Sequence, residues 1–554
     1  MKSAFGRLGV ALLFASSWSH GASGGTISGT VKGPDGAPFK GAFVRAQNTT
    51  SRIIVDVLSD RQGGYRIQDL APGKYEVRAT AVGYKTDPHG DVMVDAVQPV
   101  SLNFALQKGM VRWTDLSIYQ GQLLLPEDPG KKVLFTKCQA CHSFATKVAA
   151  TVRDEDGWRG AVSFMRDSVG VGDKRASDQD VAVLVPYLTR MFGPDSELPR
   201  SPAELPGYEK ATHAEFSDEA MKIVYVEYSL PGPNRIPWNA HPDNKGNVWI
   251  PCAKTADKFA ELNIETGKVR EWSVPLGVRH ALDVHSAMAA PDGTVWYVEG
   301  AGGKLGRFDP KTEEISEYPL PGGAGNAVRI DRLGYIWASA GAGVVRFDPK
   351  TRKFITFSEI PHPYGIEVDN YDNVWSAQFT NSEYPTDGLI GKIDINTLKV
   401  SVYTPPTTTK LASLNKEAPF EEGNAISHPK DAGTKRIAVD SKGIVYFGEW
   451  WGGQDGQHGQ IGRFDPKTET FKEYPLPDPA PTPYGIGVDH NDFVWYNSNY
   501  DDILGRLDPA TGTVVEYPFP YSDNGIREIV PDAAGRMWFT TPFNNKAGYF
   551  IPPK

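Results

Sequence analysis

The stretch Thr294-Val295-Trp296-Tyr297-Val298-Glu299 decides the fold of most of this chain, because its pattern returns many times. It is followed by a Gly-Arg-Phe-Asp-Pro-Lys-Thr turn from Gly306 and by the strand end Glu317-Tyr318-Pro319-Leu320-Pro321. The three phrases recur with periods of roughly 40 to 50 residues, once stretched by an insertion, which is typical of β-propeller blades. The repeats are anchored by Trp249, Trp296, Trp337, Trp375, Tyr446, Trp495 and Trp538. Seven anchors predict a seven-bladed propeller over residues 221–554.

The repeats leave one strand unmatched at each end of this region. The last repeat stops at Gly548-Tyr549-Phe550-Ile551-Pro552 without its outer strand, whereas Ile223 to Pro231 has the outer-strand pattern without a blade before it. We therefore expect the N-terminal strand to complete the last blade. This arrangement closes the ring and removes the free sheet edges.

Length, charge and the N-terminus bound the class of protein. A chain of 554 residues is too long for one ordinary core, so several domains are expected. Lys2 and Arg7 precede an apolar run from Leu8 to Ala15, which predicts a secretory signal peptide in residues 1–23. No later run is long and apolar enough to cross a bilayer. A net charge of −9 without a basic cluster argues against nucleic acid and anionic membranes as partners.

Lys137-Cys138-Gln139-Ala140-Cys141-His142 matches the attachment site of a c-type haem. Two thiols one helical turn apart reach the two vinyl groups of one porphyrin, and the adjacent imidazole reaches the iron. A zinc site would need a second pair of ligands, and the only other cysteine, Cys252, lies far downstream. We therefore predict one covalent haem c, attached through Cys138 and Cys141, with His142 as an iron ligand. Such attachment takes place outside the cytoplasm, so the motif and the signal peptide both indicate the periplasm.

Residues 118–195 resemble a class I cytochrome c domain, which is small and α-helical. Gly130 to Phe135 leads into the haem motif as a short amphipathic helix would, and Ser177-Asp178-Gln179-Asp180 is typical of a capping box that opens a second helix. The resemblance implies a methionine as the other axial ligand, with Met165 placed for it and Met191 as the alternative. The other interpretation makes Met165 a core residue beside an open or solvent-ligated iron.

Residues 24–108 are predicted to form a small β-sandwich. Gly29-Thr30-Val31, Gly63-Gly64-Tyr65-Arg66-Ile67 and Ala71-Pro72-Gly73-Lys74-Tyr75 combine strand alternation with turn residues. These phrases resemble the carboxypeptidase regulatory-like domain, which implies an adhesion or spacer module, with carbohydrate contact as the alternative. A Pro-rich linker is expected over residues 196–220, between the cytochrome domain and the propeller.

The propeller region resembles the virginiamycin B (streptogramin) lyases. Trp296-Tyr297-Val298-Glu299 and Lys304-Leu305-Gly306-Arg307 match their Trp-Phe-Thr-Glu and Lys-Ile-Gly-Arg phrases. The resemblance implies His285 as a catalytic histidine and Glu299 as an acidic residue that supports magnesium or another metal. A further histidine of those lyases is replaced by tyrosine in the comparable Pro-Tyr-Gly-Ile turns of this chain. That departure argues against streptogramin elimination chemistry.

Positions equidistant from each anchor occupy equivalent places around the central channel of a propeller. Eleven residues before the anchors stand Trp238, His285, Asn326, Tyr364, Lys435, Tyr484 and Arg527. Three residues after the anchors stand Cys252, Glu299, Ala340, Gln378, Glu449, Ser498 and Thr541. Blade-fixing positions should repeat, whereas these vary while staying largely polar or aromatic, as expected of a site on a repeated scaffold. The alternative is ordinary loop polarity around a water-filled channel.

Three classes of function fit these residues. The fusion with a haem motif favours a periplasmic oxidoreductase or electron-transfer protein, whose propeller binds a small-molecule substrate and whose haem serves another periplasmic redox protein. A virginiamycin B lyase-like C–O lyase with an accessory cytochrome is the second class, and a non-catalytic electron-transfer or binding protein is the third. In the favoured class His285 and Glu299 abstract a proton. The substrate is expected to contact Trp238, Tyr364, Lys435, Glu449, Tyr484 and Arg527.

Overall fold

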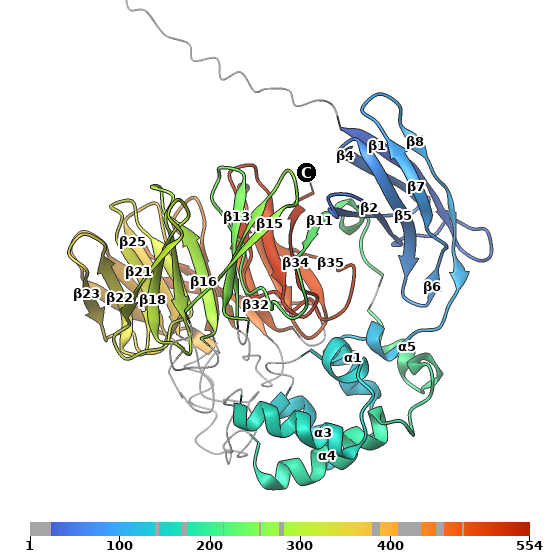
Figure 1. Cartoon of the computed structure of the whole chain (residues 1–554), viewed down its shortest axis with the longest axis horizontal. Coiled ribbons are helices and arrows are strands. Elements are labelled where there is room, and N and C mark those ends of the chain that lie inside the picture. The colour runs from blue at the N-terminus through green and yellow to red at the C-terminus, as the bar shows by residue number, and fades with distance from the viewer. Residues whose placement is uncertain are drawn as a thin grey trace, which may run out of the picture.

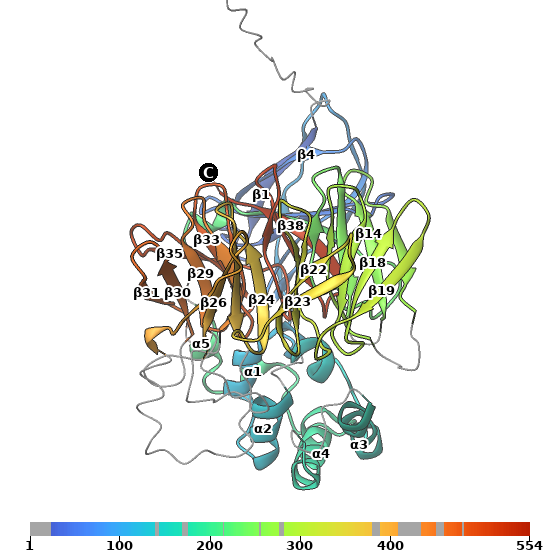
Figure 2. The same ribbon diagram turned by 90° about the vertical axis from the view of Figure 1, so that its left-hand side faces the viewer.

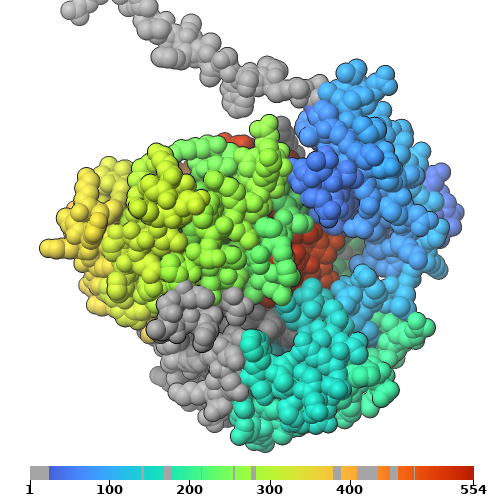
Figure 3. Space-filling model, viewed as in Figure 1, coloured from blue at the N-terminus to red at the C-terminus, as the bar shows by residue number. Residues whose placement is uncertain are grey.

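Three regions follow one another along the chain (Figure 1). The computed structural model describes residues 24–138, 143–168, 176–213, 215–253, 256–275, 282–378, 388–407, 434–449, 459–478 and 481–553. The N-terminal region is built of strands, the second is helical, and the third consists of propeller-like sheets. Both ribbon views place the helices beneath one face of these sheets (Figures 1 and 2). In the space-filling view the C-terminal sheets, drawn in red, are visible between the N-terminal strands and the helices (Figure 3).

The N-terminal region is a β-sandwich-like pair of sheets. One sheet contains β4 (Gly64–Leu70), β1 (Gly25–Lys32), β8 (Val100–Ser101) and β9 (Phe104–Ala105). The other contains β10 (Gln107–Lys108), β6 (Tyr84–Lys85), β5 (Gly73–Ala81), β7 (His89–Val94), β2 (Phe43–Asn48) and β3 (Ile54–Leu58). Alternate residues of these strands point into one core, in which Ile27, Val31, Val44 and Val77 are fully buried. The alternation read from the sequence is therefore the alternation of the sheet faces.

The helical region packs around aromatic and aliphatic side chains. Its helices are α1 (Ile118–Leu124), α2 (Pro129–Val133), α3 (Glu155–Ser163), α4 (Asp178–Phe192) and α5 (Tyr208–Ala211), with π-helical turns η2 (Leu134–Cys138), η3 (Ala145–Ala149) and η4 (Phe164–Ser168) and 3-10 turns η1 (Trp113–Asp115), η5 (Pro202–Glu204) and η6 (Ala220–Lys222). Ser177 caps α4 through the expected capping box, because its Oγ accepts the Asp180 N–H at 3.2 Å and the Asp180 carboxylate accepts the Ser177 N–H at 2.8 Å. None of the helices in the described ranges is both long and apolar enough to cross a membrane.

The described part of the predicted linker, residues 196–220, contacts two cores: its first half packs against the helical region, and Phe216 and Ala220 pack against a core of the propeller-like sheets. Leu198, Leu205 and Tyr208 contact its hydrophobic core, and Ala211 is buried in that core. The Trp113 indole N–H donates to the Pro199 carbonyl at 3.0 Å. A few apolar side chains therefore hold the first half of this segment against the helical region.

The third region contains six separate four-stranded antiparallel sheets in its described part. The sheets are β12 (His241–Pro242), β13 (Asn247–Cys252), β14 (Lys258–Asn263), β15 (Val269–Ser273); β16 (Val284–Ala289), β17 (Val295–Glu299), β18 (Lys304–Asp309), β19 (Glu314–Pro319); β20 (Val328–Ile330), β21 (Ile336–Ala340), β22 (Gly343–Asp348), β23 (Lys353–Phe357); β24 (Pro363–Val368), β25 (Asn373–Gln378), β26 (Ile390–Asp394), β27 (Val400–Tyr403); β28 (Thr434–Val439), β29 (Val445–Glu449), β30 (Gln460–Asp465), β31 (Thr470–Pro475); and β32 (Pro483–Val488), β33 (Val494–Ser498), β34 (Ile503–Leu507), β35 (Val514–Pro518).

Each anchor residue lies in the second strand of its sheet, as the repeat predicts. Four of the anchor indoles donate a hydrogen bond of 2.7–2.8 Å to an aspartate six residues earlier, as in Trp337 to Asp331 and Trp538 to Asp532. The aspartate also accepts backbone N–H groups of the turn that follows it, at 2.9 Å from Leu333 and 3.0 Å from Tyr335 in the case of Asp331. The repeated Asp and Trp therefore fix the turn to the blade core, which explains why they recur.

The last sheet is completed by the strand that opens this region, as expected. β11 (Val224–Ser229) pairs along its whole length with β38 (Lys546–Ile551), which continues into β37 (Met537–Thr541) and β36 (Val530–Pro531). The opposite edge of β11 pairs with β3, with Val226 opposite Val55, so the sandwich and the last propeller-like sheet share one ten-stranded sheet. This second pairing could not be predicted from the sequence, because β-strand edges carry no partner-specific pattern.

Candidate functional site

The side chains eleven residues before the anchors meet one another, as their spacing predicts. The rings of Trp238 and His285 lie 4.9 Å apart between centroids, and those of His285 and Tyr364 lie 5.9 Å apart. Tyr364 and Tyr484 lie 6.1 Å apart with their hydroxyl groups in contact. Residues from different sheets therefore form one cluster, which we call the ring cluster: Trp238, His285, Asn326, Tyr364, Lys435, Tyr484 and Arg527.

β-Bulges carry four of these side chains. The pairing of β16 with β17 skips His285, and the pairing of β24 with β25 skips Tyr364. Corresponding shifts occur at Lys435 in β28 and at Tyr484 in β32. A bulge adds a residue to one strand and re-aims its side chain, which is why bulges are common beside active sites. A β-bulge thus sets the direction of the side chain at each of these four ring-cluster residues.

Two cations of the ring cluster lie over its aromatic rings. The Lys435 ammonium is 5.8 Å from the centroid of Tyr364 and 5.9 Å from that of Tyr484. The Arg527 guanidinium is 4.6 Å from Tyr484 and 4.9 Å from Trp238. Lys435 is 2% exposed and Arg527 is 4% exposed. Cation–π contacts are strengthened by such burial, so the cluster combines positive charge with aromatic surface.

His285 is held in a defined orientation. Its Nδ1 lies 3.0 Å from the Asn326 carbonyl oxygen, and the ring is almost fully buried. A carbonyl oxygen can only accept, so the proton of the neutral ring resides on Nδ1 and Nε2 is the basic nitrogen. This arrangement is the one that a general base requires.

Glu299 and Glu449 occupy the second set of predicted positions and are fully buried. Burial, with the neighbouring Glu317 carboxyl group, raises the pKa of Glu299 to about 8. Burial and Glu473 likewise raise the pKa of Glu449 well above its usual value, and the Gln460 amide donates to Glu449 at 2.5 Å. Glu299 pairs with Val284 across β16 and β17 and so lies next to His285 in the register. These shifts favour an acid at neutral pH over an anionic ligand for a metal.

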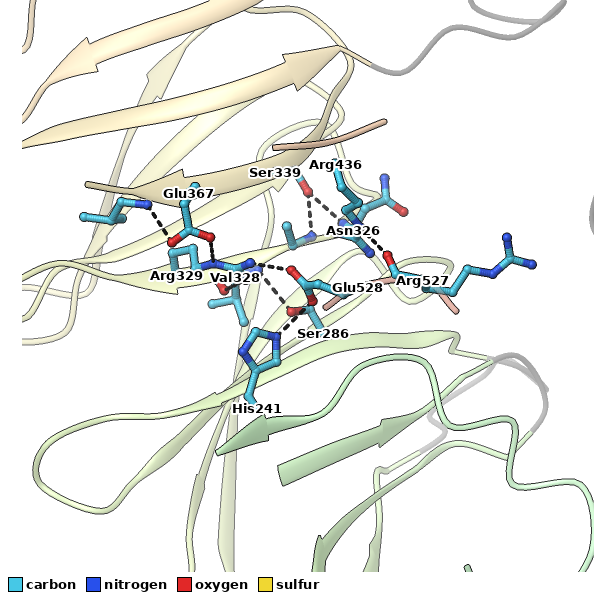
Figure 4. A network of polar contacts seen from close by, with 12 residues as sticks. His241, Ser286, Asn326, Val328, Arg329, Ser339, Glu367, Arg436, Arg527 and Glu528 are labelled. Atoms are coloured by element: carbon cyan, nitrogen blue, oxygen red, sulfur yellow. Dashed lines mark hydrogen bonds and ion pairs between the residues drawn. The ribbon is translucent and has the colours of Figure 1, made fainter. Parts of the chain in front are cut away.

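A buried charge network that the sequence reasoning missed lies behind the ring cluster (Figure 4). Arg329 pairs with Glu528 and, at 3.1 Å, with Glu367, while His241 Nε2 lies 3.1 Å from the second Glu528 oxygen. Burial alone would raise the pKa of Glu528, but Arg329, Arg436 and His241 hold it well below its usual value. His241, Arg329 and Glu367 each stand eight residues before an anchor, so a third set of equidistant positions would have revealed them.

The metal and haem predictions are only partly covered by the described residues. Within the described ranges, no group of three or more His, Cys, Asp or Glu side chains is arranged to hold a metal ion, and magnesium stays a prediction. Cys141 and His142 lie outside the described residues. Cys138 ends η2 and is partly buried against the helical core, and Met165 is half-buried in η4. The alternative ligand Met191 is 2% exposed within that core.

The helical region contains a buried donor without a hydrogen-bond partner and several exposed apolar side chains. The Trp158 indole nitrogen is buried without a hydrogen-bond partner. Leu123, Val152 and Phe164 are 50%, 70% and 53% exposed.

The segment that follows the haem motif is hydrogen-bonded to the loop that carries Arg527, one residue of the ring cluster. Asp523 accepts the backbone N–H of Phe144 at 3.1 Å and that of Thr146 at 2.5 Å. Asp502 in turn accepts the N–H groups of Asp523 and Asn524, both at 2.9 Å. Both carboxylates are buried, and this burial raises the pKa of each. Since Asp523 precedes Arg527 by four residues, the motif and the ring cluster are joined by one short loop.

Comparisons with known proteins identify the N-terminal module and find similar solved structures. The carboxypeptidase regulatory-like domain family matches residues 26–107, which confirms the predicted module there. A comparison with curated proteins gave no match. Among solved structures, a streptogramin B lyase is similar, with 22% identity and a TM-score of 0.48, over 60% of this chain and 99% of the lyase.

Two further structures are similar over comparable lengths. Virginiamycin B lyase from Staphylococcus aureus shows 20% identity and a TM-score of 0.48, over 59% of this chain and 99% of that protein. Hydrazine synthase from Kuenenia stuttgartiensis shows 10% identity and a TM-score of 0.44, over 59% of this chain and 98% of that chain. At these identities and scores the likeness carries no argument about activity.

Proposed function

We propose that this protein is a periplasmic haem c protein whose ring cluster binds a small organic substrate, and whose substrate-derived electrons leave through the haem to another periplasmic redox protein. The proposal rests on the two hydrogen bonds that the Asp523 carboxylate accepts from the backbone of Phe144 and Thr146, directly after the haem motif. They tie the predicted electron outlet to the loop that carries Arg527. The signal peptide and the Cys-x-x-Cys-His motif support export and haem attachment.

The residues of the chain divide into two sets of roles. In the helical region, Cys138 and Cys141 would attach the haem, with His142 and Met165 as iron ligands. A bound haem supplies a one-electron acceptor whose potential depends on those ligands. In the ring cluster, His285 Nε2 would accept a proton from the substrate. Glu299 on the adjacent strand would act as a positioning residue in its protonated form.

The remaining ring-cluster residues would hold the substrate. Lys435 and Arg527 supply positive charge that suits an anionic or phenolic compound. Trp238, Tyr364 and Tyr484 supply aromatic surface on which a planar group can pack. Such a site removes a proton and orients the substrate, while electron transfer depends on the nearby haem.

The experiment uses the full-length, haem-loaded protein and follows the haem absorption spectrum while candidate phenols and organic acids are added. A substrate should reduce the haem of the wild-type protein. His285→Ala should slow this reduction by about 10²-fold or more, the usual contribution of a general base, without changing reduction by dithionite. His490→Ala is the matched control, because His490 is an exposed histidine on a turn of the same region.

Three other results decide between the alternatives. Cys138→Ala with Cys141→Ala should abolish covalent haem retention, and Met165→Ala should remove the sulfur-to-iron band and lower the reduction potential. Equal substrate-driven reduction in wild-type protein and in His285→Ala would contradict the role of the ring cluster. Opening of a streptogramin-like ester with magnesium, without any change at the haem, would favour the lyase.

A further inference from the structure

A buried guanidinium group beside the ring cluster has two nitrogen atoms without a hydrogen-bond partner. Arg436, the residue after Lys435 in β28, is 2% exposed. Its Nε donates to the Arg527 carbonyl at 3.0 Å, which fixes the plane of the group, but Nη1 and Nη2 have no hydrogen-bond partner. The guanidinium carbon lies 4.9 Å from the ring centroid of Tyr364. Two parallel donors are thus presented inside the cluster.

The neighbouring carboxylate does not satisfy these donors. Both oxygens of Glu528 are engaged, one by Arg329 and the other by His241. Among the described residues, no carboxylate lies within ion-pair distance of Arg436 or Arg527. In Figure 4 the Arg527 side chain extends away from the Glu528 network, toward the side opposite Arg329. Glu528 is near enough for Arg436 to lower its pKa, but it accepts no hydrogen bond from Nη1 or Nη2. Burying donors of a cation without acceptors is costly, so this arrangement favours an added anion that accepts from them.

We propose that Arg436, Arg527 and Lys435 form an anion subsite that takes the carboxylate of an aromatic acid. The two parallel N–H groups of a planar guanidinium match the two oxygens of a carboxylate, so the pair can form two hydrogen bonds at once. The rings of Tyr364, Tyr484 and Trp238 border the three cations at 4.6–5.9 Å and provide the surface for an aromatic ring. This subsite names the substrate class of the proposed function and rests on it for the place of binding. It does not depend on the haem.

The test measures binding of 4-hydroxybenzoate to the full-length protein by titration calorimetry at low salt. Arg436→Met should raise the dissociation constant at least tenfold, which corresponds to a loss of about 1.4 kcal/mol of binding free energy. Arg436→Lys keeps the charge but removes the fork and should also weaken binding, by a smaller factor. Arg463→Met is the matched control, because Arg463 belongs to the same sheet, pairs with Asp465 at 3.5 Å and is absent from the cluster. It should bind as the wild type does.

Three probes separate the chemical classes. Benzamide, which is neutral and of similar shape, should bind at least tenfold more weakly than benzoate, and acetate, which lacks the ring, should bind more weakly than benzoate as well. Inorganic phosphate tests for a general oxyanion site. Equal affinity for benzamide and benzoate, tighter binding of phosphate than of benzoate, or no difference between Arg436→Met and the wild type with a native circular dichroism spectrum would each overturn the proposal.

The outcome is distinct from that of the functional proposal. Arg436-dependent binding of benzoates without haem reduction by any added compound would support the subsite and contradict the redox function. Haem reduction that depends on His285 but is unaffected by Arg436→Met and Arg436→Lys would support the redox function and overturn the subsite.

Discussion

Replacing Asp523 by alanine should release the segment after the haem motif from the propeller loop. Asp523 accepts two backbone N–H groups, from Phe144 and Thr146, in a place where its own side chain is 3% exposed. Hydrogen bonds to a charged group contribute about 1.5–3 kcal/mol each, so losing two costs about 3–6 kcal/mol. Three kcal/mol corresponds to a change of about 10²-fold in the local opening equilibrium.

Hydrogen exchange followed by mass spectrometry measures this opening directly. Peptides covering residues 143–149 should exchange at least 10²-fold faster in Asp523→Ala, whereas peptides of β37 and β38 should change little. Phe144 should stay packed, because it contacts Phe135 and Phe192 within the helical core. Substrate-driven haem reduction should slow as well, since the loop that carries Arg527 loses its contact with the motif.

Asp508→Ala provides the matched control, because Asp508 accepts the Ala510 N–H at 2.9 Å and the Thr511 hydroxyl at 2.8 Å within its own turn. That change should leave exchange over residues 143–149 unaltered. Unchanged protection of this segment in Asp523→Ala, or equal effects of the two substitutions, would refute the reasoning.

Two further predictions concern pH and stability. Folded Glu299 keeps its proton up to about pH 8, whereas an unfolded glutamate loses it near 4.5, so the folded state binds more protons between these values. The free energy of unfolding should therefore fall as pH rises through this window, by at most about 1.4 kcal/mol per pH unit, and Glu299→Gln should flatten that slope. Urea midpoints at pH 5, 6.5 and 8 measure it, and parallel profiles would speak against a raised pKa. Tyr225→Ala should destabilise the last sheet by about 3–5 kcal/mol, because Tyr225 is fully buried beside Phe519. Exchange over Lys546–Ile551 should rise in this variant and stay unchanged in Ser229→Ala, which alters an exposed residue of the same strand.

The repeat spacing predicted the blades and the ring cluster because both depend on local sequence order. Residues at the same distance from their anchors occupy the same place in each blade, so the sequence alone groups His285, Tyr364 and Tyr484. Arg436 escaped that reasoning because it lies one residue further along, within the bulge that also carries Lys435. The spacing identifies a position but not the shift that a bulge introduces.

Contacts between distant segments could not be predicted in the same way. Glu299 was expected as an acidic residue that supports a metal, but burial and Glu317, from another strand of the same sheet, raise its pKa. The hydrogen bond that the Thr146 N–H donates to Asp523 joins residues 377 positions apart. No periodic pattern reports such pairs, because they depend on how complete domains dock.

The pairing of β11 with both β3 and β38 has a mechanical consequence. Rotation of the sandwich relative to the propeller-like sheets would break hydrogen bonds between paired strands, because β11 pairs with β3 on one side and with β38 on the other. Arg45, bonded to Asp56 at 2.9 Å and lying 3.8 Å from Glu227, reinforces that seam with buried charge. A pull on the N-terminal module is therefore transmitted as load to the strand that closes the propeller, and the two modules keep one fixed orientation under strain.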